Sequence, residues 1–329
     1  MDLEYIYANG RVRALETTFL PERIWRALLA AQDQDEALRV LSETYYGEFL
    51  QRSQSPEEAF ERVLAATEEE LLELAEHPDL VTGLLQRRDV RNARYLWKAA
   101  LFGGGQIPVE RAGTLEPEVL QRVVSDLGAR DELPPAFSLA LETIVGGQLE
   151  VRQVDQVLDA LAARVEEEVL APLNRDLATW VRMRVEVRNF LTAGRARQAG
   201  MQRADVEAAF LDGGHHSPAE LALAYQLNDL PATLAAVPGG ERLSGVFAEA
   251  LAGGSFLPFE RESDALALDL LEDLGAETFG PGPLAAFVLL REMETAHVKL
   301  LLAGKAAGIP RARLQQRLPR GGRSAAGGV

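Results

Sequence analysis

The sequence contains no cysteine among its 329 residues. A disulfide framework, a thiolate nucleophile and a cysteine-based metal site are therefore excluded. Aromatic residues make up only 6% of the chain, which is too few for a surface that stacks nucleic-acid bases. No stretch approaches the roughly 20 continuous apolar residues needed to span a bilayer. If the protein works at a membrane, we expect it to be peripheral.

Positive charge is also scarce, because the formal net charge is −16. Nucleic-acid binding needs a basic face, so we expect no nucleic-acid partner. The exception is the end of the chain, where no acidic residue follows Glu294 but seven cations do. These are Lys299, Lys305, Arg311, Arg313, Arg317, Arg320 and Arg323. One interpretation is a solvated, weakly ordered tail, and the other is a docking strip for an acidic partner or anionic lipid headgroups.

The sequence does contain the composition and the residue spacing that are typical of α-helices. Leu and Ala dominate, and apolar residues recur at spacings of three and four over residues 154–170 and 284–301. No stretch alternates with the period of two that a strand requires. Ser55-Pro56 and Ser217-Pro218 are typical of helix starts, and Thr67 before three glutamates predicts another. The sequence therefore predicts an all-α fold.

One motif, an acid followed three residues later by Asn or His, appears three times on a Leu/Ala-rich background. The copies are Asp89-Val90-Arg91-Asn92, Glu186-Val187-Arg188-Asn189 and Glu294-Thr295-Ala296-His297. Their Asn or His residues are spaced by 97 and 108 residues, which indicates one helical unit used three times. With the Gly/Pro-rich breaks, this predicts units at 1–113, 114–213 and 214–320, followed by a flexible tail at 321–329.

Residues three apart on a helix share a face, so each copy places its acid beside its amide or imidazole. We interpret Asp89, Asn92, Glu186, Asn189 and Glu294 as candidate structural polar bridges between helices; the alternative is a shared binding surface with one strip per unit. Each copy of the motif contains a single acid, which argues against a two-carboxylate glycosidase or a metal site. His215 and His216 are expected to be solvated loop residues. We therefore predict no catalytic, cofactor-binding or metal-ligating residue.

The chain resembles the C subunit of V/A-type ATPases (ATP synthases), the counterpart of the d subunit of eukaryotic vacuolar ATPases. The resemblance covers roughly residues 5–315 and lies in the order and spacing of several short motifs. These are Tyr7-Ala8-Asn9-Gly10-Arg11-Val12-Arg13, Leu41-Ser42-Glu43-Thr44-Tyr45-Tyr46-Gly47, the helix Leu85–Asn92, the connector Gly113-Thr114-Leu115, and Arg291–Glu294 through Gly304–Pro310. The third copy departs from the family pattern, because His297 stands where Asn is usual.

The resemblance implies three helical units arranged as a pseudo-threefold funnel. It also implies a non-catalytic rotor subunit without cofactor, on the cytoplasmic face of the membrane. Its partners would be the central-stalk rotor subunits and the membrane proteolipid ring, with one copy per hetero-oligomeric complex. Such a socket would couple ATP turnover to proton or ion transport. Two alternatives remain: a soluble helical-repeat adaptor for protein or peptide partners, and a cofactor-free helical hydrolase that uses two carboxylates.

Overall fold

The computed structural model describes residues 5–103, 113–147 and 149–318, and within these ranges every regular element is a helix and no strand occurs. The all-α prediction is confirmed. The expected flexible tail at 321–329 lies outside the described residues. Contacts divide the chain into two compact units: residues 1–76 with 252–329, and residues 77–251. The three units predicted from the repeat are a different partition, and they stay a prediction.

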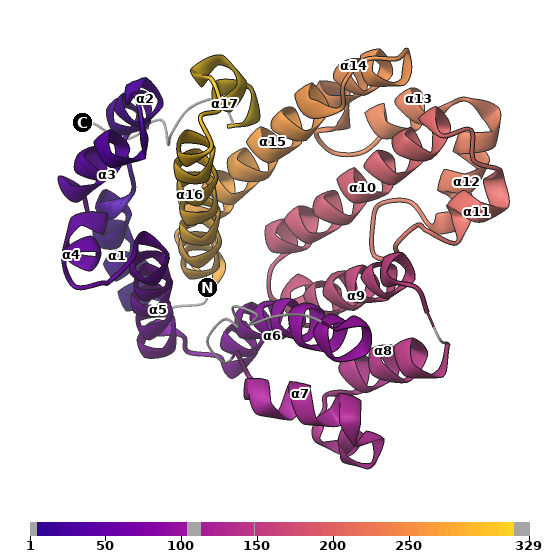
Figure 1. The fold of residues 1–329 in the computed structure, drawn as a ribbon, viewed down its shortest axis with the longest axis horizontal. Helices are drawn as coiled ribbons and strands as arrows, with labels where there is room; N and C mark the ends of the chain where they lie inside the picture. Colours follow the sequence, from indigo (N-terminus) through magenta and orange to yellow (C-terminus); the bar gives the residue numbers. More distant parts are fainter. Residues whose placement is uncertain (1–4, 104–112, 148, 319–329) are drawn as a thin grey trace. The chain divides into compact units, whose positions relative to one another are not determined.

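The first unit is assembled from both ends of the sequence (Figure 1). Its helices are α1 (Ile6–Leu15), η1 (Glu16–Thr18), α2 (Glu22–Ala30), α3 (Gln34–Ser42), α4 (Tyr46–Gln51), α5 (Pro56–Leu74), α15 (Leu257–Ala276), α16 (Gly282–Ala306) and α17 (Arg311–Arg317). α16 is the central helix, since it packs against α15, α5, α3 and α1. Its apolar residues Val298 and Leu301 share a core with Tyr46 and Phe60. The N-terminal helices therefore bury their apolar faces against the C-terminal ones.

The second unit is continuous in sequence. It contains α6 (Pro78–Phe102), α7 (Pro117–Ser125), η2 (Leu127–Glu132), α8 (Pro135–Gly146), α9 (Val151–Val165), the π-helical turn η3 (Glu166–Leu170), η4 (Ala171–Leu173), α10 (Arg175–Gln198), α11 (Arg203–Glu207), α12 (Pro218–Leu227), α13 (Leu230–Ala235) and α14 (Gly240–Leu251). α6 packs against α7, α9 and η3. Trp97 of α6 is fully buried in this core, and its indole N–H donates to the Leu120 carbonyl at 2.9 Å.

The predicted helix starts are mostly correct. Ser55 and Ser217 cap α5 and α12, each accepting the backbone N–H three residues on, and a proline fills the next position. The prediction that Thr67 begins a helix is wrong, because α5 continues through it without a break. The buried Thr67 hydroxyl donates to the Val63 carbonyl at 2.9 Å, four residues back. A threonine can therefore lie inside a helix when a backbone carbonyl of the preceding turn accepts the hydroxyl hydrogen.

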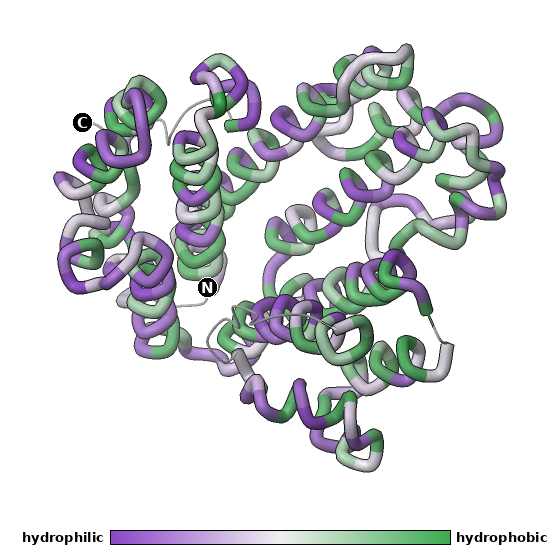
Figure 2. Tube along the Cα trace, in the orientation of Figure 1, coloured by the Kyte–Doolittle hydropathy of each residue, from purple (hydrophilic) through white to green (hydrophobic). Residues whose placement is uncertain are grey.

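The three copies of the motif lie on the three longest helices of the described chain, α6, α10 and α16, which have 25, 24 and 25 residues. Hydrophobic and hydrophilic residues are both present along these helices (Figure 2). Each helix is long enough to present both a packed apolar face and the buried acid of the motif. The repeat found in the sequence thus corresponds to a repeated structural element.

Candidate functional site

The three acids of the motif are buried: Asp89 and Glu186 are fully inaccessible, and Glu294 is 8% exposed. An ionised carboxylate removed from water is costly unless hydrogen-bond donors surround it. Each of these acids does have such donors, and most come from a connection that leads into another helix. We call each acid with its donors a clamp: the first clamp at Asp89, the second at Glu186 and the third at Glu294.

In the first clamp, Asp89 of α6 holds the connection that leads into α7. The backbone N–H groups of Gly113, Thr114 and Leu115 donate to its two oxygens at 3.1, 2.8 and 3.2 Å. The Thr114 hydroxyl adds a fourth hydrogen bond at 2.7 Å. Burial raises the pKa of Asp89 above its ordinary value, and these four donors work in the opposite direction. One side chain therefore fixes three consecutive backbone positions.

In the second clamp, Glu186 of α10 holds the connection that leads into α12. The backbone N–H groups of His215 and His216 donate to one carboxylate oxygen at 2.8 and 3.2 Å. The other oxygen lies 2.5 Å from Nδ1 of the His216 ring. The two histidines are part-buried and lie against Glu186, so the expectation that they are solvated is wrong. Burial lowers the pKa of His215, which favours its neutral form.

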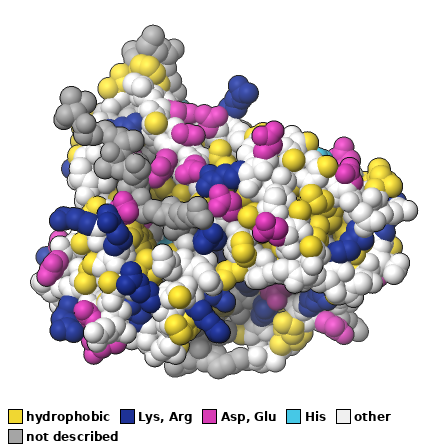
Figure 3. Space-filling model, turned by 90° about the horizontal axis from the view of Figure 1, so that it is seen from above, with side chains coloured by type: hydrophobic (Ala, Val, Ile, Leu, Met, Phe, Trp, Pro, Cys, Tyr) yellow, Lys and Arg dark blue, Asp and Glu magenta, His cyan; other side chains and the backbone are white. Residues whose placement is uncertain are grey.

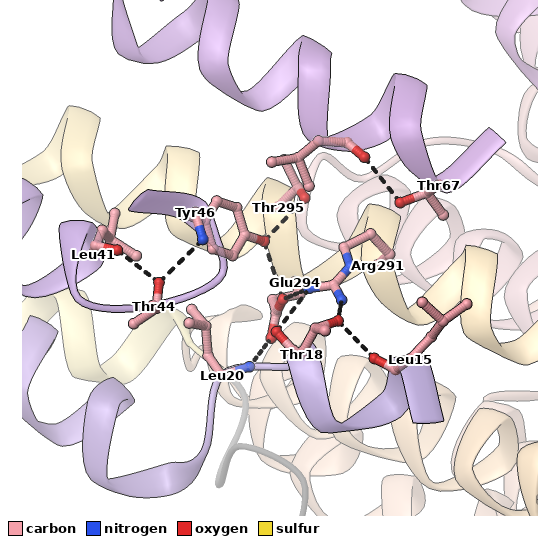
Figure 4. Close-up of polar contacts among 11 residues, drawn as sticks. Leu15, Thr18, Leu20, Leu41, Thr44, Tyr46, Thr67, Arg291, Glu294 and Thr295 are labelled. Carbon is pink, nitrogen blue, oxygen red and sulfur yellow. Dashed lines mark hydrogen bonds and ion pairs between the residues drawn. The ribbon is translucent and has the colours of Figure 1, made fainter. Parts of the chain in front are cut away.

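In the third clamp, Glu294 of α16 holds the connection that leads into α2 (Figure 4). The Leu20 backbone N–H donates to one oxygen at 2.6 Å, and the Tyr46 hydroxyl donates to the other at 3.0 Å. The Arg291 guanidinium, one turn earlier on α16, lies 2.5 Å from the same carboxylate. Arg291 also donates to the Thr18 hydroxyl. Burial raises the pKa of Glu294 and that of the Tyr46 hydroxyl, with Arg291 opposing both effects.

The three clamps share one register. Leu115, His216 and Leu20 each donate a backbone N–H, and each stands two residues before the first helical residue of α7, α12 and α2. A buried acid on a long helix thus fixes the point from which the next helix starts. This spacing is not visible in the sequence around the acids, because the third connection lies 274 residues away from its acid.

A small residue makes this approach possible in two of the clamps. A Cβ added to Gly113 would lie 2.4 Å from an Asp89 oxygen, and one added to Gly214 would lie 2.6 Å from a Glu186 oxygen. Counted from the next helix, the same position in the third clamp is Thr18. There the hydroxyl receives Arg291, so the extra side chain has a polar partner.

The Asn or His at the end of the motif has different contacts in the three copies. Asn189 is fully buried and forms two hydrogen bonds with the backbone of Leu211, accepting its N–H at 2.8 Å and donating to its carbonyl at 2.9 Å. Asn92 is also fully buried. His297 is part-buried, and burial lowers its pKa to about 4, so the ring is neutral near pH 7. The structural role predicted for the five candidate residues stays a prediction.

A line of ion pairs braces the second unit. Glu166 of the π-helical turn lies 2.8 Å from Arg87 of α6 and 2.6 Å from Arg184 of α10. Arg94 of α6 pairs with Asp155 and Asp159 of α9. The remaining members are Lys98 with Asp155 and Arg188 with Asp159. Burial alone would raise the pKa of Glu166, but its two arginines lower it below the ordinary value.

Sequence reasoning missed the partners of the acids. Arg291 and Tyr46 belong to motifs of the family resemblance, and neither was predicted to contact an acid, although a completely buried arginine needs a nearby carboxylate. The Glu three residues after Arg291 was the available signal, because that spacing places both on one helix face. Among the described residues, no three His, Asp or Glu side chains gather in a way that could hold a metal ion. Nor is any described helix both long and apolar enough to cross a bilayer.

The chain is similar to known proteins over most of its length. The family model of the ATP synthase (C/AC39) subunit matches residues 8–317. The C subunit of the V-type ATP synthase of Thermus thermophilus is 27% identical over an alignment that covers 95% of this chain and 98% of the relative. The C subunit of the A-type ATP synthase of Halorubrum lacusprofundi is 25% identical, with coverages of 92% and 94%. The corresponding A-type protein of Thermococcus gammatolerans is 27% identical, with coverages of 70% and 66%. The chain belongs to the ATP synthase (C/AC39) subunit family.

Proposed function

We propose that this chain is a non-catalytic coupling subunit of a V/A-type ATP synthase. It would connect the central-stalk rotor subunits to the membrane proteolipid ring on the cytoplasmic face. Family membership over residues 8–317 is the observation that carries the proposal. In this role the chain transmits torque between ATP turnover and proton or ion transport, and three helical units at 1–113, 114–213 and 214–320 would form a pseudo-threefold funnel.

The clamps support a mechanical role for the chain. Asp89, Glu186 and Glu294 are buried and occupied by backbone donors, so none is free to act as an acid, base or metal ligand. Each clamp prevents its connection from shifting relative to the long helix without exposing unpaired N–H groups, which is costly. We therefore propose that the five motif residues are structural polar bridges that stiffen the chain.

The experiment that tests the coupling role compares membranes with and without this chain. Membranes from a deletion strain should retain ATP hydrolysis by the head of the complex but lose ATP-driven proton pumping. Adding back the purified chain should restore pumping. Purification of the tagged chain should also recover the ring protein and a central-stalk protein together. Unchanged pumping in the deletion strain would exclude the proposal.

A variant of the first clamp tests the stiffness of this chain separately from the assembly of the complex. Asp89→Asn keeps an acceptor oxygen but removes the negative charge that three backbone N–H groups share. If the clamps serve torque transmission, the complex with this variant should assemble and hydrolyse ATP while pumping fewer protons per ATP. Arg152→Gln, an exposed substitution at the start of α9, is the matched control and should leave this ratio unchanged.

A further inference from the structure

Two neighbouring helices of the first unit carry a group of exposed arginines. α2 and α17 pack against one another. We call their exposed arginines the α2–α17 basic face. Its members are Arg23, Arg26, Arg311, Arg313 and Arg317. Figure 3 shows several Lys and Arg side chains on the left of the view, with Asp and Glu side chains among them. The positive charge of this face contrasts with the net charge of the whole chain, which is −16.

Most of these arginines have no acidic partner within the described chain. Only Arg26 pairs with an acid, Glu22, at 3.3 Å, and both side chains are largely exposed. Arg23 and the three arginines of α17 form no ion pair with any described residue. Arg313 and Arg317 stand four residues apart, a spacing at which like charges destabilise a helix by a few tenths of a kcal/mol. An external anion would remove that cost.

The face is held in a defined position. Lys305 of α16 is buried and donates to the carbonyls of Leu29 and Ala31, which ends α2 at a fixed place. Leu314 of α17 is 2% exposed and packs on Gly304, where an added Cβ would lie only 2.3 Å from the leucine. The arginines are therefore presented by two anchored helices, which reduces the entropy lost when an anion binds.

The chemistry of the face selects its ligand. All five cations are arginines, whose planar guanidinium groups bind phosphate through two parallel hydrogen bonds. Within α2 and α17, both fully described, no large apolar side chain is exposed. A protein partner would normally need an aromatic or aliphatic anchor at the centre of its interface. An array of phosphates needs only charge and donors, and groups of four to eight cations are typical of contacts with anionic lipids.

We propose that the α2–α17 basic face binds the headgroups of anionic phospholipids. The inference extends the proposed function and rests on it, because a protein seated on a membrane ring works close to the bilayer surface. Arg23, Arg313 and their neighbours would contact the phosphate layer without inserting into it. The acidic remainder of the chain is repelled by the same surface, so the contact would also favour one orientation of the first unit.

The test is vesicle binding by the purified full chain, without other subunits. We expect co-sedimentation with vesicles that contain phosphatidylglycerol and none with pure phosphatidylcholine. Arg313→Gln with Arg317→Gln should weaken the partition by about thirtyfold, since each cation near an anionic surface contributes a factor of about five. Arg152→Gln with Arg175→Gln removes two exposed charges elsewhere and is the matched control.

Three outcomes would overturn the inference: no binding to phosphatidylglycerol vesicles at about 0.1 M salt, an equal loss in the control pair, or retention on poly-glutamate with no vesicle binding. The last result would assign the face to an acidic polypeptide. Circular dichroism of both double variants shows whether the chain has remained folded. None of these results bears on proton pumping by the deletion strain, so failure here is distinguishable from failure of the proposed function.

Discussion

The first and third clamps solve the same problem over very different distances along the chain. Asp89 holds a connection 24 to 26 residues downstream, whereas Glu294 holds Leu20, which is 274 residues upstream. The first clamp uses one hydroxyl and three backbone N–H groups. The third uses a single backbone N–H and adds a tyrosine hydroxyl and a buried arginine.

The difference shows what a distant connection requires. Where the connection follows the acid closely, the backbone approaches at a glycine, and residues of the connection itself supply the partners of the carboxylate. Where it belongs to the other end of the chain, side chains from α4 and α16 complete the site. Arg291 is also stacked against aromatic rings, with its guanidinium carbon 4.2 Å from the centre of Phe19 and 4.9 Å from that of Tyr45. The third clamp therefore joins charge, hydrogen bonds and aromatic packing.

The largest effect should come from removing the acid of the third clamp. Glu294→Ala leaves the fully buried Arg291 without its carboxylate, which should lower the free energy of unfolding by about 3–5 kcal/mol. Urea unfolding followed by circular dichroism measures this loss. Glu294→Gln with Arg291→Met removes both charges and should recover part of it. If the single and double variants are equally destabilised, the buried arginine is not the reason for the loss.

Removal of the acid of the first clamp should cost less. Asp89→Ala leaves three backbone N–H groups without acceptors but strands no opposite charge, so we expect a loss of about 2–3 kcal/mol. Hydrogen exchange at Gly113 to Leu115 should become faster, while exchange at Leu20 should not change. A cost for this variant above that of Glu294→Ala would reverse the comparison between the two clamps.

The His297 ring provides a pH test of the third copy. Its pKa is lowered from 6.5 to about 4 by burial, so the unfolded chain binds a proton that the folded chain does not bind. Stability from this residue is complete above pH 6.5 and is lost as the pH falls toward 4. Between pH 7 and pH 5 the chain should lose about 1–2 kcal/mol more than His297→Gln does. Identical pH profiles of the two proteins would contradict the neutral buried ring.

The smallest effect is expected from the ion pairs around Arg94. This side chain is 27% exposed, and pairs of this kind contribute at most about 1 kcal/mol. Arg94→Met should therefore shift the urea midpoint slightly at low salt and not at all at about 0.5 M salt. The effect of Asp89→Ala should be the same at both salt concentrations, because Asp89 is itself buried and its partners are uncharged donors. A salt-dependent Asp89 effect would remove this distinction between clamps and surface pairs.

The sequence alone was sufficient to predict the helices and the repeated acid on each long helix. The helical period, the two serine caps and the repeated acid are local patterns, and the structure confirms the all-α fold that they predict. Thr67 shows the limit of such patterns, because a helix-start signal inside a good helix has no effect. The donors of Glu294 could not be found this way. Nothing local in Leu20 or Tyr46 indicates contact with a residue more than 240 positions away.

The first unit has a consequence for how the protein is made. Leu20 is synthesised long before Glu294, which stands 274 positions later in the chain. At usual elongation rates this delay is roughly 15–55 s. Throughout that time the helices α1 to α5 expose the apolar surface that α16 later covers. The yield of the finished protein would then depend on protection of this nascent segment by a chaperone, and not on rapid local folding.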